Sequence, residues 1–549
     1  MRILTASDRA LLVEAADLDE AMRLNLAWAE VPGIAELVPG ARTVLVRFDP
    51  ARTTADALAA VLADTAVDAA HVPHVGEATI PVRYDGEDLA DVADLLAVSA
   101  EEVVARHLAA QWQVAFSGFA PGFGYAVGSD PLFDVPRRSS PRTRVPAGSV
   151  ALAGHFTGVY PRESPGGWQL IGRTDAVMWD IDRDPPALLA PGTLVRFVRA
   201  DREAAAGAGA AAGAGTVAGA GAGAGAAAGS GDRRATRERM HDGSGVLEVV
   251  RPGLQTLVQD GGRPGHAALG VSASGAADRT GLRDANRAVG NDAGAAALEI
   301  VGAAQLRYRG PATVAAVTGA VSELVRTAAD GGRATLRHGV PFALDDGDEL
   351  HLGHPVRGLR QVVGVRGGVA AEPALGSSAA DTLAGLGPAP LRAGDAVRIG
   401  DPRRAPHAVD PAPVPRALPA AGEVVELGIT WGPRDDWFRP DALDTLLGQE
   451  WEVTPRSDRV GIRLRGAVAL ERAVPGELPS EGAVTGAIQV PPDGQPVLFL
   501  PDHPLTGGYP IIGAVVDRDL DLAGQLPPGA RIRFRAAPRR GASSEEDPS

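Results

Sequence analysis

The residues with the clearest chemical potential lie between Gly118 and Thr174, where the motifs GFAPGFGYAVG, PRTRVPAGSVALAG and SPGGWQLIGRT follow one another. Aromatic side chains alternate there with glycine, proline and arginine. Such a composition indicates a specified backbone, with rings for stacking or packing and guanidinium groups for an anion. The candidates for ligand binding are Phe119, Phe123, Tyr125, Arg142, Ser149, Gly166, Gly167 and Arg173. The alternative for each is a place in an ordinary β-turn, with the arginines facing solvent.

His107 is the histidine of interest in this half, because it precedes the Gly118 segment on a predicted helix over residues 100–111. A histidine can act as an acid or base near neutral pH. It can also simply pack a helix against its neighbours. Both interpretations stay open at this stage.

A second set of candidates lies in the later part of the chain. Gln259 and Arg263 precede SASGAADRTGLRDAN, which contains Ser274, Asp278 and Asn286. Asp278 stands before a helical stretch, so it is either a helix cap or a ligand for Mg²⁺ or a substrate amine. The closing motifs contribute Arg459, Ser480, Gln489, Asp502, Thr506, Gly507, Gly508 and Tyr509. An arginine fork can hold a carboxylate or phosphate, and consecutive glycine N–H groups can cup an oxyanion. We take His107, Asp278, Arg459 and Asp502 as the candidate catalytic residues.

Composition excludes several other chemistries. The chain has no cysteine and no lysine, so all 53 basic residues are arginine. Disulfides, thiolate metal sites, Schiff-base catalysis and a covalently attached biotin are therefore excluded, and no P-loop, HExxH or GxSxG motif occurs. The formal charge of −15 argues against nucleic acid as a partner. The N-terminus carries charges too early for a signal peptide or membrane span, so we expect a cytoplasmic protein without a membrane partner.

The elements that must position these residues divide at a Gly/Ala-rich tract. We predict a small α/β domain over residues 1–77, a β-barrel over 78–200, a linker over 201–243, two further β domains over 244–415 and 416–540, and a disordered tail over 541–549. A tether of this kind raises the effective concentration of the parts it joins without fixing their orientation. We therefore expect the two halves to dock on each other directly.

Short internal repeats predict that the two halves share a barrel type. PGGWQLIG (165–172) recurs as TGGYPIIG (506–513), and PGTLVRF (191–197) recurs as PGARIRF (528–534) in the same order. LDDGDELHLG (344–353) and LRAGDAVRIG (391–400) also match each other at the apolar and Gly-Asp positions. The fold class that follows is mostly β with α+β elements.

The motifs between Gly118 and Thr174 resemble the family of the 5-oxoprolinase B subunit, also described as kinase-inhibitor-like or allophanate hydrolase subunit 1-like. The segment from Val249 to Asn291, together with TPRSDRVGIRLRG, PSEGAVTGAIQVPPDGQP and TGGYPIIG, resembles the family of the 5-oxoprolinase C subunit, also called biotin-dependent carboxyltransferase-like. The chain thus resembles a fusion, and we call residues 1–200 the B-like half and residues 244–540 the C-like half. The resemblance implies cyclophilin-like barrels.

It also implies an enzyme component that hydrolyses 5-oxo-L-proline to L-glutamate with ATP and Mg²⁺, together with a partner that resembles the A subunit of 5-oxoprolinase. The candidates named above would then bind a small-molecule substrate or ATP, and a homo-oligomer is compatible with this reading. Two alternatives remain: the carboxyltransferase part of a urea carboxylase or allophanate system, and a regulator that inhibits a histidine kinase. The chain departs from the family pattern at His503 to Leu505, at Val362 and at Ser377 to Asp381, which puts any role of those positions in doubt.

Overall fold

The computed structural model describes residues 1–66, 75–138, 140, 142–200, 245–412, 414–476 and 478–537. The predicted linker and tail lie outside the described residues. The chain forms two compact units, the first made of residues 1–72, 118–120 and 243–549 and the second of residues 73–117 and 121–242. None of the helices in the described ranges is long and apolar enough to cross a membrane.

The small N-terminal domain is a four-stranded antiparallel sheet with two helices. It contains β1 (Arg2–Ser7), β2 (Ala10–Glu14), α1 (Leu18–Ala27), β3 (Ile34–Pro39), β4 (Thr43–Phe48) and α2 (Ala55–Asp64), in the sheet order β1-β2-β4-β3. The Asp17 and Thr54 side chains accept hydrogen bonds from backbone N–H groups in the first turns of α1 and α2, which fixes where each helix begins.

The second compact unit is built on one seven-stranded sheet. Its elements are β5 (Gly76–Val82), α3 (Leu89–Leu95), α4 (Ala100–Ala109), β6 (Trp112–Ser117), β7 (Gly124–Gly128), β8 (Arg142–Val145), β9 (Ser149–Ala153), β10 (Phe156–Val159), β11 (Ser164–Gly166), β12 (Gln169–Arg173) and β13 (Thr193–Arg199). The order is β12-β9-β10-β7-β6-β13-β5, and two backbone hydrogen bonds of 2.8 Å between Arg83 and Arg173 join its two ends. We call this the first barrel.

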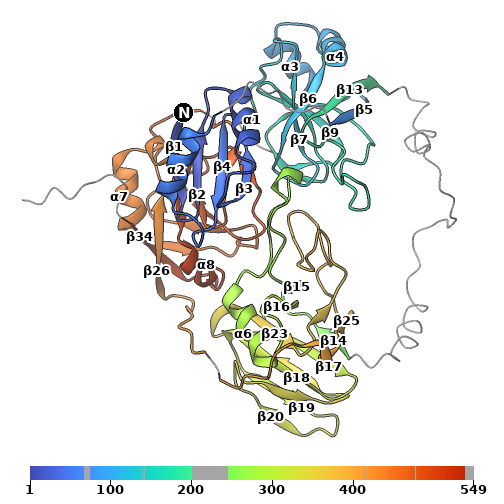
Figure 1. Ribbon diagram of the computed structural model, residues 1–549, viewed down its shortest axis with the longest axis vertical. Helices are drawn as coiled ribbons and strands as arrows, with labels where there is room; N and C mark the ends of the chain where they lie inside the picture. The colour runs from blue at the N-terminus through green and yellow to red at the C-terminus, as the bar shows by residue number, and fades with distance from the viewer. Residues whose placement is uncertain are drawn as a thin grey trace, which may run out of the picture. The chain divides into compact units, whose positions relative to one another are not determined.

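The C-like half begins with two packed sheets, and the helix α6 (Arg279–Val289), visible in Figure 1, packs on one of them. One sheet contains β14 (Val246–Arg251), β17 (Ala304–Arg309), β19 (Leu324–Thr327), β20 (Arg333–Thr335), β22 (Glu349–Leu352), β24 (Val369–Ala370) and β25 (Ala396–Ile399). The other contains β15 (Gln255–Gln259), β16 (Ala297–Val301), β18 (Thr313–Val321), β21 (Phe342–Leu344) and β23 (Arg357–Val365). Short 3-10 turns lie at η4 (Ala267–Leu269) and η5 (Pro402–Arg404).

The second barrel closes the C-like half. Its strands are β26 (Val424–Trp431), β27 (Trp451–Val453), β28 (Gly461–Arg465), β30 (Ala487–Gln489), β31 (Val497–Phe499), β33 (Ile511–Val515) and β34 (Arg531–Ala536), which form a closed barrel. The short pair β29 (Glu481–Gly482) and β32 (Thr506–Gly507) lies outside it, with η6 (Asp435–Trp437), α7 (Pro440–Gly448) and α8 (Asp517–Ala523).

The two barrels share one topology, which confirms the barrel repeat predicted from the sequence echoes. In each, the last strand pairs in parallel with the first strand and antiparallel with the second: β13 with β5 and β6, and β34 with β26 and β27. Replacing each strand of the first order by its counterpart gives β33-β30-β31-β28-β27-β34-β26, which is the ring order of the closed barrel. Positions in one barrel therefore have definable counterparts in the other.

The N-terminal domain and the second barrel share a hydrophobic core. Its buried members include Leu12, Val38 and Leu45 from the first sheet, with Ala487 and Ile511 from the barrel. Strand β1 lies beside β26 and β33, and β4 lies beside β29. The N-terminal domain of the B-like half thus meets the second barrel of the C-like half through apolar side chains.

Candidate functional site

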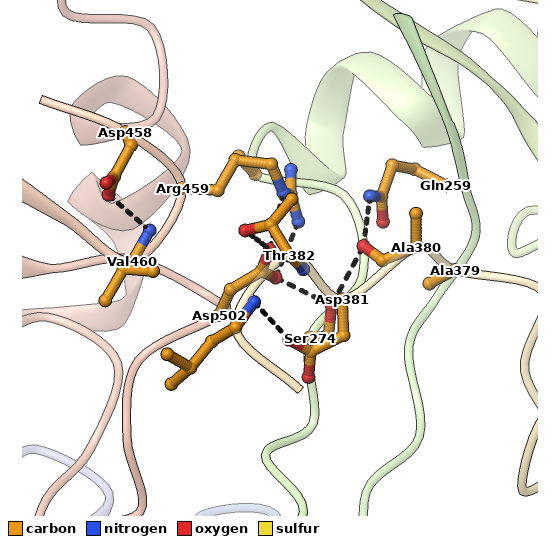
Figure 2. Close-up of polar contacts among 12 residues, drawn as sticks. Gln259, Ser274, Ala379, Ala380, Asp381, Thr382, Asp458, Arg459, Val460 and Asp502 are labelled. Carbon is orange, nitrogen blue, oxygen red and sulfur yellow. Dashed lines mark hydrogen bonds and ion pairs between the residues drawn. The ribbon is translucent and has the colours of Figure 1, made fainter. Parts of the chain in front are cut away.

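Five of the predicted site residues meet around the loop formed by residues 379–382, and Figure 2 labels all of them except Arg263. Gln259, at the end of β15, donates from Nε2 to the Ala380 carbonyl at 2.7 Å, and the Ser274 hydroxyl lies 3.5 Å from the same oxygen. Arg263 donates to the Ala379 carbonyl, and Asp502 accepts from the Thr382 N–H at 2.9 Å. Loops of the two-sheet domain and of the second barrel therefore build one polar cluster, which we call the Arg459 cluster after its central side chain.

Arg459 and Asp502 form the centre of this cluster, and both are buried. Arg459 donates from Nε to Asp502 Oδ2 at 3.0 Å and from Nη2 to Asp502 Oδ1 at 3.1 Å, while Nη1 lies 2.5 Å from Glu299 Oε1. Burial alone would raise the pKa of Asp502, but the charge and hydrogen bonds of Arg459 outweigh it and hold that pKa below its ordinary value. The guanidinium thus compensates two buried carboxylates at once.

Ser274 connects the Arg459 cluster to a cavity. Its hydroxyl donates to Asp502 Oδ1 at 2.7 Å, and its backbone has a φ of +51°, a left-handed conformation that serine rarely adopts. The adjacent cavity of about 240 Å³ is lined by the N-terminal domain (Ser7, Asp8, Arg9, Ala10, Arg47), the two-sheet domain (Gly261, Pro264, Ala273, Ser274, Ala276, Ala277, Arg279) and the second barrel (Val484, Thr485, Leu500, Pro501, Val515, Asp517, Leu520). The arginines there are ion-paired, Arg9 and Arg279 with Asp517 and Arg47 with Glu36.

Asp381 is a member of the cluster that the sequence did not single out as a site residue. Its carboxylate accepts from the Ser272 hydroxyl at 3.1 Å and from the Leu383 and Ala384 N–H groups at 3.0 and 2.7 Å. Burial, followed by the nearby charge of Asp502, raises the pKa of Asp381 to about 6. This carboxyl group can therefore change protonation near pH 6.

The closing motif of the C-like half contacts the opening motif of the B-like half. Phe119, with a φ of +63°, donates from its backbone N–H to Thr506 Oγ1 at 3.0 Å. A Cβ added at Gly118 would lie 2.5 Å from the same hydroxyl oxygen, so glycine is needed for this approach. Thr506 is buried, and its neighbour Gly507 pairs with Glu481 across β29 and β32. Two signature segments, 387 residues apart in the chain, thus come together.

Comparisons with known proteins agree with this arrangement. Family models for the carboxyltransferase domain match residues 1–189 (subdomains C and D) and residues 269–536 (subdomains A and B). The C subunit of the 5-oxoprolinase of Escherichia coli K12 is 34% identical over 53% of this chain and 90% of its own length. The B subunit of the 5-oxoprolinase of Escherichia coli O157:H7 is 41% identical over 32% of this chain and 83% of its own length. This chain belongs to the families of the B and C subunits of 5-oxoprolinase.

Two further relatives show how the family arrangement varies. A crystal structure of the protein TTHA0988 is 33% identical with a TM-score of 0.75, and the match covers 96% of this chain and 100% of that one. A crystal structure is therefore known for a related single chain that covers both family regions. The urea amidolyase of Lachancea kluyveri is 31% identical over 53% of this chain and 17% of its own length.

Asp278 caps α6, as one of its two interpretations predicted. Its Oδ1 accepts from the Gly281 N–H at 2.8 Å, both oxygens accept from Arg416 at 2.6 and 2.8 Å, and Oδ2 accepts from Gln525 at 2.6 Å. These contacts occupy the carboxylate, so Asp278 does not fit the Mg²⁺ ligand role. Asn286 is equally occupied within α6 and the following loop, by the Ala295 carbonyl and Asn291.

His107 is buried inside the first barrel. Its Nδ1 lies 2.8 Å from the Tyr84 hydroxyl and its Nε2 lies 3.0 Å from Thr157 Oγ1, and burial lowers its pKa to about 3. The Trp112 Nε1–H donates to the His107 carbonyl, just as the Trp451 Nε1–H donates to the Leu446 carbonyl in the second barrel. Leucine occupies the counterpart position, so the geometry is that of the packing interpretation.

Arg142 is held inside the first barrel by a buried carboxylate. Its Nη1 and Nη2 donate to Asp88 Oδ2 and Oδ1 at 2.9 and 2.8 Å, and Arg138 adds a 2.6 Å contact to Oδ1. Burial would raise the pKa of Asp88, but its hydrogen bonds, that from Arg142 first, keep it below the ordinary value. The guanidinium is thus engaged within the fold.

The other predicted residues of the first barrel are also engaged there. Phe123, Tyr125 and Trp168 pack as edge-to-face rings with centroids 5.0 to 5.4 Å apart. The remaining candidates have local contacts: Ser149 with the Pro146 carbonyl, Arg173 with Asp85, Gly166 with Tyr160, and Gly167 with the Arg138 N–H.

In the closing motif, Gln489 donates to the Tyr509 carbonyl at 3.2 Å, and the Arg472 guanidinium lies 5.7 Å from the Tyr509 ring centre. Ser480 accepts from the Ala41 N–H through its carbonyl at 2.8 Å. Gly508 follows β32 directly. Among the residues that the structure describes, no group of three or more His, Asp or Glu side chains could hold a metal ion.

Proposed function

We propose that this chain is the fused B and C component of an ATP-dependent 5-oxoprolinase, which hydrolyses 5-oxo-L-proline to L-glutamate with a separate A-like subunit. The observation that carries the proposal is that the relatives of its two halves are named as two subunits of the same enzyme. The shared core of the N-terminal domain and the second barrel supports it, because two components that act together need a permanent interface.

The chemistry of the substrate explains why several components are needed. A five-membered lactam is an unstrained amide, and phosphorylation of its oxygen by ATP gives the ring carbon a leaving group. The residues that handle such a species act chiefly by positioning and by stabilising charge. In this chain the Arg459 cluster and the arginine-lined cavity next to Ser274 supply fixed dipoles and charges of that kind.

The carboxyltransferase component of a urea carboxylase is the second candidate, favoured by the description of the matching family models and by the urea amidolyase match. Its biotin would have to be carried on another chain, because this one has no lysine. The B-like half favours the 5-oxoprolinase over the carboxyltransferase, because it is 41% identical to a protein named as a subunit of 5-oxoprolinase.

Reconstitution tests the proposal. The purified chain is combined with the A-like subunit from the same organism, and glutamate release from 5-oxo-L-proline is measured with and without ATP. We expect ATP-dependent release from the mixture and negligible release from either protein alone. ATP-dependent carboxylation of urea in the presence of a biotinylated carrier, without glutamate release, would instead support the carboxyltransferase.

A further inference from the structure

A second cavity, of about 440 Å³, lies where the N-terminal domain meets the second barrel. It is lined by Met1, Arg2, Glu14, Ala15, Ala16, Arg42 and Thr43 on one side and by Arg434, Asp436, Trp437, Leu478, Pro479, Ser480 and Glu481 on the other. It shares no lining residue with the cavity next to Ser274. We call it the Glu481 cavity. Its volume falls in the range of small-molecule sites.

A buried ion pair forms one wall of the Glu481 cavity. Arg434 donates from Nε and Nη2 to Glu481 Oε2 at 2.8 and 2.6 Å, and its Nη1 contacts Glu14 Oε1 from the N-terminal domain. All the guanidinium contacts to Glu481 fall on one carboxylate oxygen. The other oxygen, Oε1, is buried and has no hydrogen-bond partner among the described residues.

Thr43 presents a second polar atom in the same state. Its Oγ1 is buried without a hydrogen-bond partner in the described ranges, and Thr43 is one of the residues that line the same cavity. Thr43 Oγ1 and Glu481 Cα both lie within 3.0 Å of the position that a Cβ would take at Gly40, so the two residues are neighbours. Buried polar groups without partners cost about 1–3 kcal/mol each, so each of these two atoms calls for an explanation.

The first barrel shows that the unpaired oxygen is not a requirement of the fold. Arg142 pairs with Gly166 across β8 and β11 at the place where Glu481 pairs with Gly507 across β29 and β32, and Asp88 occupies the counterpart of Arg434. Both barrels thus have an ion pair at this place, but the positions of the arginine and the carboxylate are exchanged. In the first barrel both Asp88 oxygens are satisfied, since Oδ2 also accepts from the Leu170 N–H at 2.7 Å.

The rim of the Glu481 cavity carries a guanidinium that is available to an anion. Arg42 is exposed and has no side-chain partner in the part of the chain that the structure describes, whereas Arg2 is held by Asp436 at 2.8 Å. Burial raises the pKa of Glu481 to about 7, although Arg434 opposes the shift, so this carboxyl group can either donate or accept a hydrogen bond near neutral pH. Thr43 can do the same.

We propose that the Glu481 cavity binds a small carboxylic acid that carries a cis-amide, with the amide N–H and C=O on Glu481 and Thr43 and the carboxylate on Arg42. A cis-amide offers a donor and an acceptor side by side, which matches two neighbouring groups that can each take either role. Lactams have this geometry enforced by the ring. Naming 5-oxo-L-proline as the member of this class rests on the proposed function.

Calorimetric titration of the full chain tests the site. The probes are 5-oxo-L-proline, pyrrolidin-2-one, which lacks the carboxylate, and cyclopentanecarboxylate, which lacks the amide. The variants are Thr43→Val and Arg42→Gln, with Arg404→Gln as the matched control because Arg404 is exposed and does not line the cavity. We expect 5-oxo-L-proline to bind most tightly, each cavity variant to weaken it about tenfold, equivalent to about 1.4 kcal/mol, and the control to match wild type.

A stability measurement separates a ligand role from a structural one. Because Thr43 Oγ1 makes no hydrogen bond within the described protein, Thr43→Val should melt at the wild-type temperature or above it while binding more weakly. Absent binding of 5-oxo-L-proline, or equal binding by wild type and both cavity variants, would overturn the inference. Reconstituted turnover with unchanged KM in Arg42→Gln also overturns it and leaves the proposed function standing. If the cavity variants weaken binding but the reconstituted mixture shows no turnover, the inference stands and the proposed function is overturned.

Discussion

Replacing Arg459 by lysine should destabilise the C-like half strongly. The guanidinium makes four contacts of 2.5 to 3.1 Å, to Asp502, Glu299 and the Gly275 carbonyl, from a fully buried position. A single ammonium nitrogen keeps the charge but cannot reach all these acceptors at once. At least one buried carboxylate then loses its partner. Breaking a buried pair costs about 3–5 kcal/mol, and the retained charge places our expectation near 3 kcal/mol.

The assay is differential scanning calorimetry of the full chain, in which loss of about 3 kcal/mol lowers the transition of the affected unit by several degrees. Arg463→Lys is the control, because Arg463 lies exposed on β28, four residues away, and should change stability by less than about 0.5 kcal/mol. A melting temperature for Arg459→Lys within error of wild type would refute the reasoning. It would mean that the carboxylates do not depend on the guanidinium fork.

Other parts of the molecule give three further predictions. Cleavage within residues 202–231 should leave the two fragments co-eluting on a sizing column at micromolar concentration, because Leu12, Val38 and Leu45 pack into the core of the C-like half; separate elution would contradict this. Gly166→Ala should lower the melting temperature more than Gly507→Ala, because the new Cβ would lie 2.2 Å from the buried Tyr160 hydroxyl in the first case and 2.6 Å from the movable Gln489 amide in the second; equal melting temperatures would contradict this. Asp381→Asn should flatten the dependence of stability on pH. With its pKa raised from 3.8 to about 6 in the folded state, Asp381 favours folding by up to about 3 kcal/mol below about pH 4 and loses that contribution as the pH rises through 6. Urea unfolding at pH 5 and 8 should therefore differ by about 1.4 kcal/mol more in wild type than in the variant, and an unchanged profile in the variant would contradict this.

Much of the fold could be predicted because its signals are local. The helix over residues 100–111 follows from apolar periodicity, and α4 forms there. The repeated PGG and TGG motifs predicted a shared barrel type, and the strand orders agree. The packing of the N-terminal domain against the second barrel could not be predicted from local sequence patterns. It depends on contacts between apolar faces that are hundreds of residues apart in the chain.

The candidate site was predictable only in part, for the same reason. Gln259, Arg263, Ser274, Arg459 and Asp502 were chosen as polar residues in Gly-rich motifs, and the fold brings them together. The sequence did not show, however, which residues each of these side chains contacts. Asp381 and Glu481 become notable only once their surroundings are known, because burial shifts their pKa values. Even so, Glu481 lies next to the predicted Ser480, in the motif PSEGAVTG.

The reversed ion pair gives a physical account of how one repeated barrel can hold two different environments. The two positions face each other in both barrels, so any pair of opposite charges satisfies the fold, and the order of the signs is free to vary. With arginine on the strand, the first barrel keeps a buried carboxylate whose two oxygens are fully hydrogen-bonded. With glutamate on the strand, the second barrel keeps a carboxyl group with one oxygen unpaired, among the described residues, beside a cavity. Exchanging the two charges therefore gives a purely structural ion pair in one barrel and a carboxyl group that can bind a ligand in the other. The strand order is the same in both.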